Sequence, residues 1–327
     1  MTVFYYRDEK MKVLLLYYSQ TGNTQKIAWR IRDGIKASGY DVYVRTIKDM
    51  DYSLLEKYEL IGLGTPVWCA DPPILRKFFD ECPRQSGKLA FTFCTHGTMP
   101  ALYFPVVNRN LRKLGFRVIG WKDWYGDCTL QVFPSPYFTA GHPDETDLSE
   151  AFEFGGLMAE NGKKILEGDE SLIPLAEVAN VPSSQASAVC DLLSSNHSAH
   201  GDLTRDEEKC LYPKCHICQD NCPMGYIKLE DSRYGKHGTW CGDGHGCSYC
   251  ELLCPTGAIH PVVPYEELAP VGVIQPYEMF HKILDKAEEE GKFRRLIEYD
   301  EVGNDTPYYY MNPKHPRIRP LSVRDDN

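Results

Sequence analysis

The chain has 327 residues, which is enough for about two domains. Its formal net charge of −10 argues against a nucleic-acid-binding surface, since such surfaces are usually basic, and favours partners with basic docking patches. The apolar run at 13–18 is too short for a signal sequence or a membrane span, so we expect a cytoplasmic protein with no membrane span. In that reducing compartment, clustered cysteines hold metal more often than they form disulfides.

Residues 12–168 alternate between strand patterns and helix patterns. Strands are predicted at 12–18, 41–47, 58–64, 88–94 and 115–124, and helices at about 25–36, 74–81, 104–114 and 148–166. This alternation is typical of a parallel sheet that helices cover on both faces. The first region, 1–168, is therefore predicted to be an α/β, doubly wound domain.

The composition changes after this region. Residues 169–205 are rich in Ser, Ala and Asn, which predicts a linker. Residues 206–262 hold eight of the thirteen cysteines and show little periodicity, so this small domain is expected to depend on something other than a large core. The remainder, 263–327, is a C-terminal extension with one helix pattern at 277–290 and a Pro- and Tyr-rich tail.

The stretch "SQTGNT" follows the first strand directly and opens the first helix. Its residues are Ser19, Gln20, Thr21, Gly22, Asn23 and Thr24. Backbone N–H groups at a helix N-terminus, together with hydroxyl donors, favour an anion. The loop has no Lys or Arg, which suits a phosphomonoester better than a nucleotide triphosphate. The alternative is an ordinary βα turn in which Thr21 and Asn23 only cap the helix.

The loop resembles the Ser/Thr-x-Thr-Gly-x-Thr loop of the flavodoxin family. That resemblance implies a five-stranded sheet in the order 2-1-3-4-5 and an FMN cofactor. It also implies that the loops after the third, fourth and fifth strands contact the flavin, with Trp68 beside the isoalloxazine ring. The residues concerned are Thr65, Pro66, Val67 and Trp68, then Cys94, Thr95, His96 and Gly97, and finally Tyr125 and Asp127. The alternatives are core packing for Trp68 and a structural loop role for His96, to which no acid–base role is assigned.

Two stretches in the cysteine-rich region repeat one spacing. They are Cys210-x4-Cys215-x2-Cys218-x3-Cys222-Pro223 and Cys241-x5-Cys247-x2-Cys250-x3-Cys254-Pro255. They resemble the bacterial ferredoxin run, in which the fourth cysteine binds the other cluster. One [4Fe–4S] cluster would then take Cys210, Cys215, Cys218 and Cys254, and the other would take Cys222, Cys241, Cys247 and Cys250.

The first gap in each run is four or five residues long, where the ferredoxin pattern has two. Zinc knuckles are the main alternative, and disulfides are a further one. Zinc ribbons need neither the third cysteine at x3 nor the proline after it, and both runs have them. The small domain is therefore expected to have a ferredoxin-like α+β fold, closed by a strand within 256–262.

The two modules together resemble the flavodoxin–ferredoxin fusion proteins of anaerobic bacteria and archaea. The favoured hypothesis is an electron-transfer protein that passes electrons between FMN and two [4Fe–4S] clusters and on to redox partner proteins. The alternative is an FMN-dependent reductase of a small acceptor, such as a quinone, fed with electrons through the clusters. No residue stands out as an acid–base catalyst, and the sequence leaves open whether two copies form a homodimer.

Overall fold

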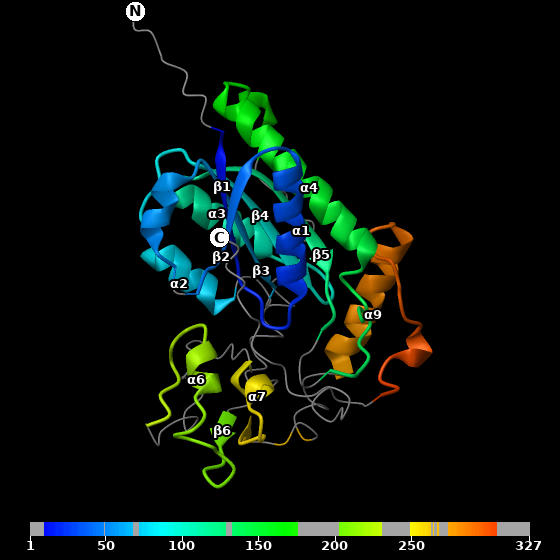
Figure 1. Ribbon diagram of the computed structural model, residues 1–327. Coiled ribbons are helices and arrows are strands. Elements are labelled where there is room, and N and C mark those ends of the chain that lie inside the picture. Colours follow the sequence, from blue (N-terminus) through cyan, green and yellow to red (C-terminus); the bar gives the residue numbers. More distant parts are fainter. Residues whose placement is uncertain are drawn as a thin grey trace, which may run out of the picture.

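The computed structural model describes residues 10–48, 50–67, 72–128, 133–175, 203–230, 249–262, 264, 267 and 274–305. The side chains of Pro73 and of residues 274–279 lie outside this description. Within it, an open sheet with helices on both faces occupies one end of the molecule, and short elements of the cysteine-rich region lie beyond one edge of that sheet (Figure 1). Predictions that fall on Trp68, Cys241 and Cys247 lie outside the described residues.

The sheet has five parallel strands. They are β1 (Lys12–Tyr17), β2 (Asp41–Thr46), β3 (Leu60–Pro66), β4 (Leu89–His96) and β5 (Arg117–Tyr125). Their order is β2-β1-β3-β4-β5, which confirms the order implied by the sequence resemblance. Every residue of β4 is buried, because strands in the middle of such a sheet are covered on both faces and carry apolar residues almost continuously.

Side chains alternate between the two faces of the strands and so build two cores. Val13 and Leu15 of β1 join the core beneath α1 (Asn23–Ala37) and α4 (Glu145–Leu166). Leu14 and Leu16 join the core beneath α2 (Pro73–Glu81) and α3 (Tyr103–Lys113), where η1 (Tyr52–Lys57) also packs. The four helices therefore cover the two faces in pairs (Figure 1).

Helices α1 and α4 lie in close contact over their shared face. A Cβ atom on Gly155 of α4 would lie 2.1 Å from the backbone oxygen of Ile31 in α1, so only glycine permits this approach. Helix α4 begins three residues before the predicted start, because Asp144 caps it by accepting hydrogen bonds from the amides of Thr146 and Asp147.

The cysteine-rich unit contains two short helices, α6 (Ile217–Asn221) and α7 (Tyr249–Leu253), which are offset by 32 residues at both ends. The same offset relates Gly225 and Gly257, which follow the two Cys-Pro pairs and have φ of 67° and 69°. Each glycine amide donates to the carbonyl of the cysteine three residues earlier. The repeated spacing in the sequence is thus a repeated local structure.

A small antiparallel pair closes this unit. Strand β7 (Ile259–Pro261) lies within the predicted closing segment, and its partner is β6 (Leu203–Arg205). Residues 203–205 were expected to belong to the linker. They instead supply a strand, and Leu203 is buried in the apolar cluster of the cysteine-rich unit.

The C-terminal extension contributes α9 (Ile274–Glu289) and the short helix η3 (Tyr299–Glu301), while η2 (Glu170–Leu172) follows α4. Phe280 and Leu284 of α9 and Phe293 form a third apolar cluster with residues of the 133–138 segment. The extension therefore packs against the insertion between β5 and α4. Among the described helices, none combines the length and the apolar character that crossing a bilayer requires.

Candidate cofactor-binding sites

The four loops predicted to contact the flavin meet at the carboxyl edge of the sheet, where open parallel sheets bind ligands. The Val67 amide donates to the Thr95 carbonyl at 2.9 Å, and the Gly126 amide donates to the His96 carbonyl at 2.9 Å. The hydroxyl oxygens of Thr24 and Thr95 lie 2.8 Å apart. The ends of β3, β4 and β5 and the start of α1 are thereby joined by direct hydrogen bonds.

The loop between β1 and α1 has the backbone that an anion site needs. Gly22 is the N-cap of α1 with φ of 103°, a conformation that favours glycine, and the helix start carries no side-chain cap. Asn23 was expected to be a possible cap. Its Nδ2 instead donates to the carbonyl oxygen of Asp127 at 2.9 Å. A helix N-terminus that its N-cap side chain does not cover suits an anion such as the phosphate of FMN.

His96 ends β4 and is buried at this edge. Its Nε2 lies 2.9 Å from an oxygen of Asp123 in β5, while its Nδ1 is buried and has no hydrogen-bond partner among the described residues. Burial favours protonated Asp123, but the hydrogen bond from His96 outweighs this and lowers the pKa of the carboxyl. An unsatisfied buried nitrogen costs about 1–3 kcal/mol, so a polar group of a bound ring would stabilise this position.

Tyr125 is the last residue of β5, and Asp127 lies in the loop that follows. The Tyr125 ring lies 4.6 Å from the His96 ring, and burial raises the pKa of the tyrosine hydroxyl. Burial likewise raises the pKa of Asp127 to about 6. A carboxyl group there suits the hydroxyl or N–H donors of a flavin nucleotide better than its phosphate. A Cβ atom on Gly97 would lie 3.0 Å from Cys128, so the loops after β4 and β5 touch.

Two predicted site residues have side chains that point away from the edge. Cys94 is fully buried among the residues that face α2 and α3, and burial raises the pKa of its thiol. Thr65 donates to the backbone oxygen of Pro66 and to the hydroxyl of Tyr103. Only their backbone atoms are placed to contact a cofactor.

Four cysteines line one cavity in the cysteine-rich unit. They are Cys210, Cys215, Cys218 and Cys254, the four assigned to one cluster from the sequence. Apolar side chains such as Ile217, Leu229 and Ile259 complete the wall, together with Arg205. Cys222 and Cys250, two of the four assigned to the other cluster, are buried in the same apolar cluster of residues. The structure thus brings Cys254 of the second run to the cysteines of the first.

Six of the described cysteines lie in this unit: Cys210, Cys215, Cys218, Cys222, Cys250 and Cys254. No three of these six bring their Sγ atoms within 4.8 Å of one another. A tetrahedral zinc site, with Zn–S bonds of about 2.3 Å, places its sulfur atoms about 3.8 Å apart.

The electrostatics of the cavity differ from one thiol to the next. Burial raises the pKa of Cys218 to about 11, and the neighbouring Cys254 and Cys210 add to this. Burial also opposes ionisation of Cys254, but backbone N–H groups of Ile259, Thr256 and Ala258 outweigh it and lower the pKa. N–H groups directed at a sulfur are among the interactions that set the potential of an iron–sulfur cluster.

The cysteine-rich unit lies at the same end of the molecule as the carboxyl edge of the sheet (Figure 1). Met224, two residues after Cys222, packs against both the apolar cluster of this unit and the core beneath α2 and α3. Lys48, just after β2, donates to the backbone oxygen of Asp220 in α6. These contacts hold the cysteines close to the edge where the flavin loops meet.

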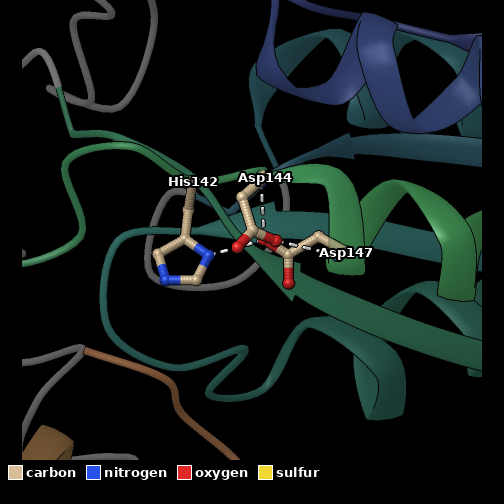
Figure 2. A group of neighbouring side chains, drawn as sticks. All are labelled: His142, Asp144 and Asp147. Atoms are coloured by element: carbon tan, nitrogen blue, oxygen red, sulfur yellow. Dashed lines mark hydrogen bonds and ion pairs between the residues drawn. The ribbon is translucent and has the colours of Figure 1, made fainter. Parts of the chain in front are cut away.

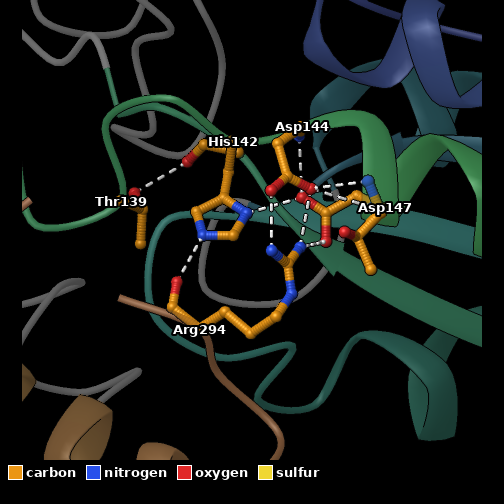
Figure 3. A network of polar contacts seen from close by, with 7 residues as sticks. Thr139, His142, Asp144, Asp147 and Arg294 are labelled. Carbon is orange, nitrogen blue, oxygen red and sulfur yellow. Dashed lines mark hydrogen bonds and ion pairs between the residues drawn. The ribbon is translucent and has the colours of Figure 1, made fainter. Parts of the chain in front are cut away.

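A third group of side chains was not foreseen from the sequence. His142, Asp144 and Asp147 present one nitrogen and two carboxylates to a common point, as a metal site would (Figure 2). Figure 3 shows that the guanidinium of Arg294 pairs with both carboxylates. It holds the pKa of Asp144 well below its usual range. The arginine therefore supplies the positive charge that a metal ion would bring.

Comparisons with known proteins agree with the fold of the sheet region. Residues 15–91 match the family model for flavodoxin. A flavodoxin from Clostridium saccharobutylicum is 35% identical over 89 residues, which is 26% of this chain and 56% of that protein. The chain thus spans about half the length of this relative. The family model does not reach the cysteine-rich unit.

Three further matches extend over most of their own length. A Megasphaera elsdenii flavodoxin is 28% identical over 112 residues, covering 33% of this chain and 82% of the relative. An NAD(P)H dehydrogenase (quinone) from Acidovorax ebreus is 26% identical over 199 residues, covering 48% and 99%. A solved archaeal flavodoxin is 24% identical, with a TM-score of 0.38, and covers 47% of this chain and 99% of that one. The sheet region is a flavodoxin-like domain.

Proposed function

We propose that the chain is an electron-transfer protein that binds FMN at the carboxyl edge of its sheet and two [4Fe–4S] clusters in its cysteine-rich unit. FMN accepts one or two electrons, whereas each cluster passes one. A protein with both cofactors converts between two-electron and one-electron partners, or relays electrons between them.

The FMN assignment rests on the flavodoxin-like fold and on donors at the expected places. The start of α1 would hold the phosphate, with hydroxyls of the loop at 19–24 as further donors. His96 Nδ1 would contact a polar atom of the ring, because it is buried at the same edge without a partner among the described residues. Trp68 remains the proposed neighbour of the ring.

The cluster assignment is carried by the cavity that Cys210, Cys215, Cys218 and Cys254 line together. This set combines three cysteines of the first run with the last of the second, as the shared-ligand pattern of two-cluster ferredoxins requires. The repeated helices α6 and α7 support a second cluster with Cys222 and Cys250. Cys241 and Cys247 are its proposed remaining ligands.

The position of the cysteine-rich unit supports transfer within one molecule. Through Met224 and Lys48 the unit touches the sheet domain at the end where FMN would bind. We further propose that the chain divides into regions 1–168, 206–262 and 263–327. Strand β6, which directly precedes the second region, is assigned to the cysteine-rich unit because it pairs with β7. We also propose that the partners are redox proteins with basic surfaces.

A second candidate is an FMN-dependent reductase of a small acceptor. The observation that favours it is the similarity to the Acidovorax ebreus protein named as a quinone dehydrogenase, of which the match covers 99%. The two functions differ in whether a nicotinamide nucleotide reduces the flavin directly.

An anaerobic preparation tests both functions. The purified protein is assayed for FMN, iron and sulfide, and its visible spectrum is followed after NADH or NADPH is added alone. We expect FMN, iron and sulfide to be present, no bleaching with the nucleotides, and prompt bleaching with a reduced ferredoxin or flavodoxin. Rapid bleaching by NADH or NADPH would favour the reductase, and protein without iron would refute the cluster assignment.

A further inference from the structure

The C-terminal segment, residues 274–305, is fastened to the loop that follows β5. Phe293 lies with its ring 4.7 Å from that of Tyr125, which also lies beside the rings of His96 and His142. Phe280 of α9 packs against Phe133 in the same apolar cluster. A segment distant in sequence thus covers part of the proposed flavin site.

Arg294 anchors this segment by charge. Its two terminal nitrogens each lie 2.6 Å from an oxygen of Asp144, and one of them lies 2.9 Å from Asp147. The Arg294 backbone oxygen lies 2.8 Å from Nε2 of His142, and Nδ1 of that ring lies 2.5 Å from Asp147 (Figure 3). The pair with Asp144 is bidentate, which is the stronger kind of ion pair, and its two side chains are 38% and 26% exposed. The side chain of Asp147, which makes the single contact, is only 9% exposed.

Hydrogen bonds continue from this anchor to the phosphate loop. The amide of Asp127 donates to the carbonyl of His142 at 2.9 Å, and the carbonyl of Asp127 accepts from Nδ2 of Asn23 at 2.9 Å. Thr139 adds a bond from its hydroxyl to the carbonyl of Gly126 at 2.8 Å. Each link is short, and the chain ends at the first residue of α1.

We infer that Arg294 is a positioning residue for the FMN site, because it fixes the 126–128 loop and, through that loop, the start of α1. The inference rests on the proposed FMN function. The guanidinium touches no cofactor itself. When it is removed, the 126–128 loop loses the support of the C-terminal segment, and Asn23 is held less firmly in the geometry that binds phosphate.

The first test is FMN affinity, measured by quenching of flavin fluorescence well below the melting temperature of each variant. We expect R294Q to raise the Kd for FMN roughly tenfold, in the usual range for coupling between sites. The matched control is K292Q, which removes the same charge two residues away, where Lys292 pairs, among the described residues, with the exposed Glu290 alone. An unchanged Kd in R294Q, or an equal change in K292Q, would overturn the inference.

A second variant separates a specific effect on FMN binding from misfolding of R294Q. D144N retains a good N-cap for α4, since Asn and Asp cap helices equally well, but weakens the pair with Arg294. We expect its Kd to rise in the same direction by a smaller factor. In a double mutant with N23A, R294Q should have less effect than in the wild type, because the link to α1 is already cut. Strict additivity would contradict the proposed route.

Hydrogen exchange separates failure of this inference from failure of the proposed function. In FMN-free protein, R294Q should speed exchange of the Asp127 amide at least fivefold, while amides in the centre of β4 stay unchanged. If the wild type does not bind FMN, the proposed function fails, and the exchange result still decides whether Arg294 anchors the loop. If FMN binds and exchange is unaltered, the inference alone fails.

Discussion

The sheet domain and the cysteine-rich unit are held together by different means. In the sheet domain, two extensive cores of aliphatic and aromatic side chains fill the space between strands and helices. The described core of the cysteine-rich unit is small, and cysteines make up a large part of it. A unit of this size rarely supplies enough apolar burial by itself. The first domain is stabilised by hydrophobic packing, and we expect the second to fold on its metal.

The largest expected effect follows from removing the metal. Anaerobic chelation of iron should unfold residues 203–262, because ligand binding and folding of such units are coupled. The sheet domain should keep its thermal transition. Limited proteolysis with mass spectrometry would locate the cleavage sites, and circular dichroism would follow the sheet domain. Cleavage spread equally over both regions would contradict the comparison.

Substitution of a single proposed cysteine ligand tests this prediction more closely. C254S should lower the iron content of the purified protein by roughly half, since one of the two proposed clusters would lose a ligand. The matched control is C82S, because Cys82 lies buried in the sheet domain at the end of α2 and burial raises the pKa of its thiol to about 11. C82S should keep its full iron content. Equal losses in both variants would show that stability of the chain, and not ligation, controls the iron.

The sheet domain is expected to respond to loss of packing. Phe91 in β4 is fully buried and contacts the rings of Phe93 and Phe154. F91A should lower the free energy of unfolding by about 3–5 kcal/mol through the cavity it leaves. Urea titration of far-ultraviolet circular dichroism measures this. An iron content of the purified, never-unfolded F91A equal to that of the wild type would support separate stabilisation of the two regions, and a parallel loss of iron would contradict it.

The anchor of the C-terminal segment should depend on pH. Nδ1 of His142 faces a carboxylate and Nε2 faces a carbonyl, so only a doubly protonated ring satisfies both. Burial disfavours the charge, but the hydrogen bonds to Asp147 and to the Arg294 carbonyl outweigh it and raise the pKa of His142. Its stabilising contribution is therefore complete below about pH 6.5 and is lost as the pH rises through the raised value.

Urea titrations at several pH values between about 5 and 9 measure this contribution. The stability of H142N should vary less over the upper part of this range than that of the wild type. H281N provides the control, because His281 pairs with Asp285 inside the C-terminal segment and is one-third exposed. If both variants keep the same pH dependence as the wild type, His142 is not the titrating group.

Exposed ion pairs give the smallest expected effect. Lys163 and Glu167 form an i,i+4 pair on α4 with more than half of each side chain in water. K163A should change the stability of the sheet domain by less than about 0.5 kcal/mol, because solvent screens such pairs. A larger change, measured by urea titration, would mean that α4 depends on surface charge as well as on packing.

Local patterns in the sequence were sufficient to predict the strands of the sheet. The near-continuous apolar runs at 12–18 and 88–94 predicted buried strands. The strand order was predicted from the flavodoxin resemblance, and the observed order confirms it. The ferredoxin resemblance grouped Cys210, Cys215, Cys218 and Cys254, and these four line one cavity, while their role as cluster ligands stays a prediction. Both signals lie within short segments, where periodicity or spacing determines the outcome.

Contacts between distant segments left no such signal. Asp144 caps α4 in the structure, but nothing in the neighbouring sequence indicates Arg294, which lies 150 residues away. Leu203–Arg205 is too short a strand to show alternation, and its polar surroundings predicted a linker. Asn23 was predicted to bind the cofactor, with capping of α1 as the alternative, yet its amide reaches a loop that the sequence places 104 residues later. Tertiary structure decides such pairings.

The position of Arg294 near the end of the described chain has a consequence for biosynthesis. The sheet domain is complete once α4 ends at Leu166, and domains generally fold as units while the chain is still being made, at about 5–20 residues per second. Strand β6 cannot pair until β7 has been synthesised, and Asp144 cannot pair with Arg294 until later still. For an interval on the order of ten seconds, the nascent protein therefore has a folded sheet domain whose 126–128 loop is not yet held by the C-terminal segment. FMN would enter the nascent chain most easily during that interval, before residues 274–305 are synthesised and pack against the loop.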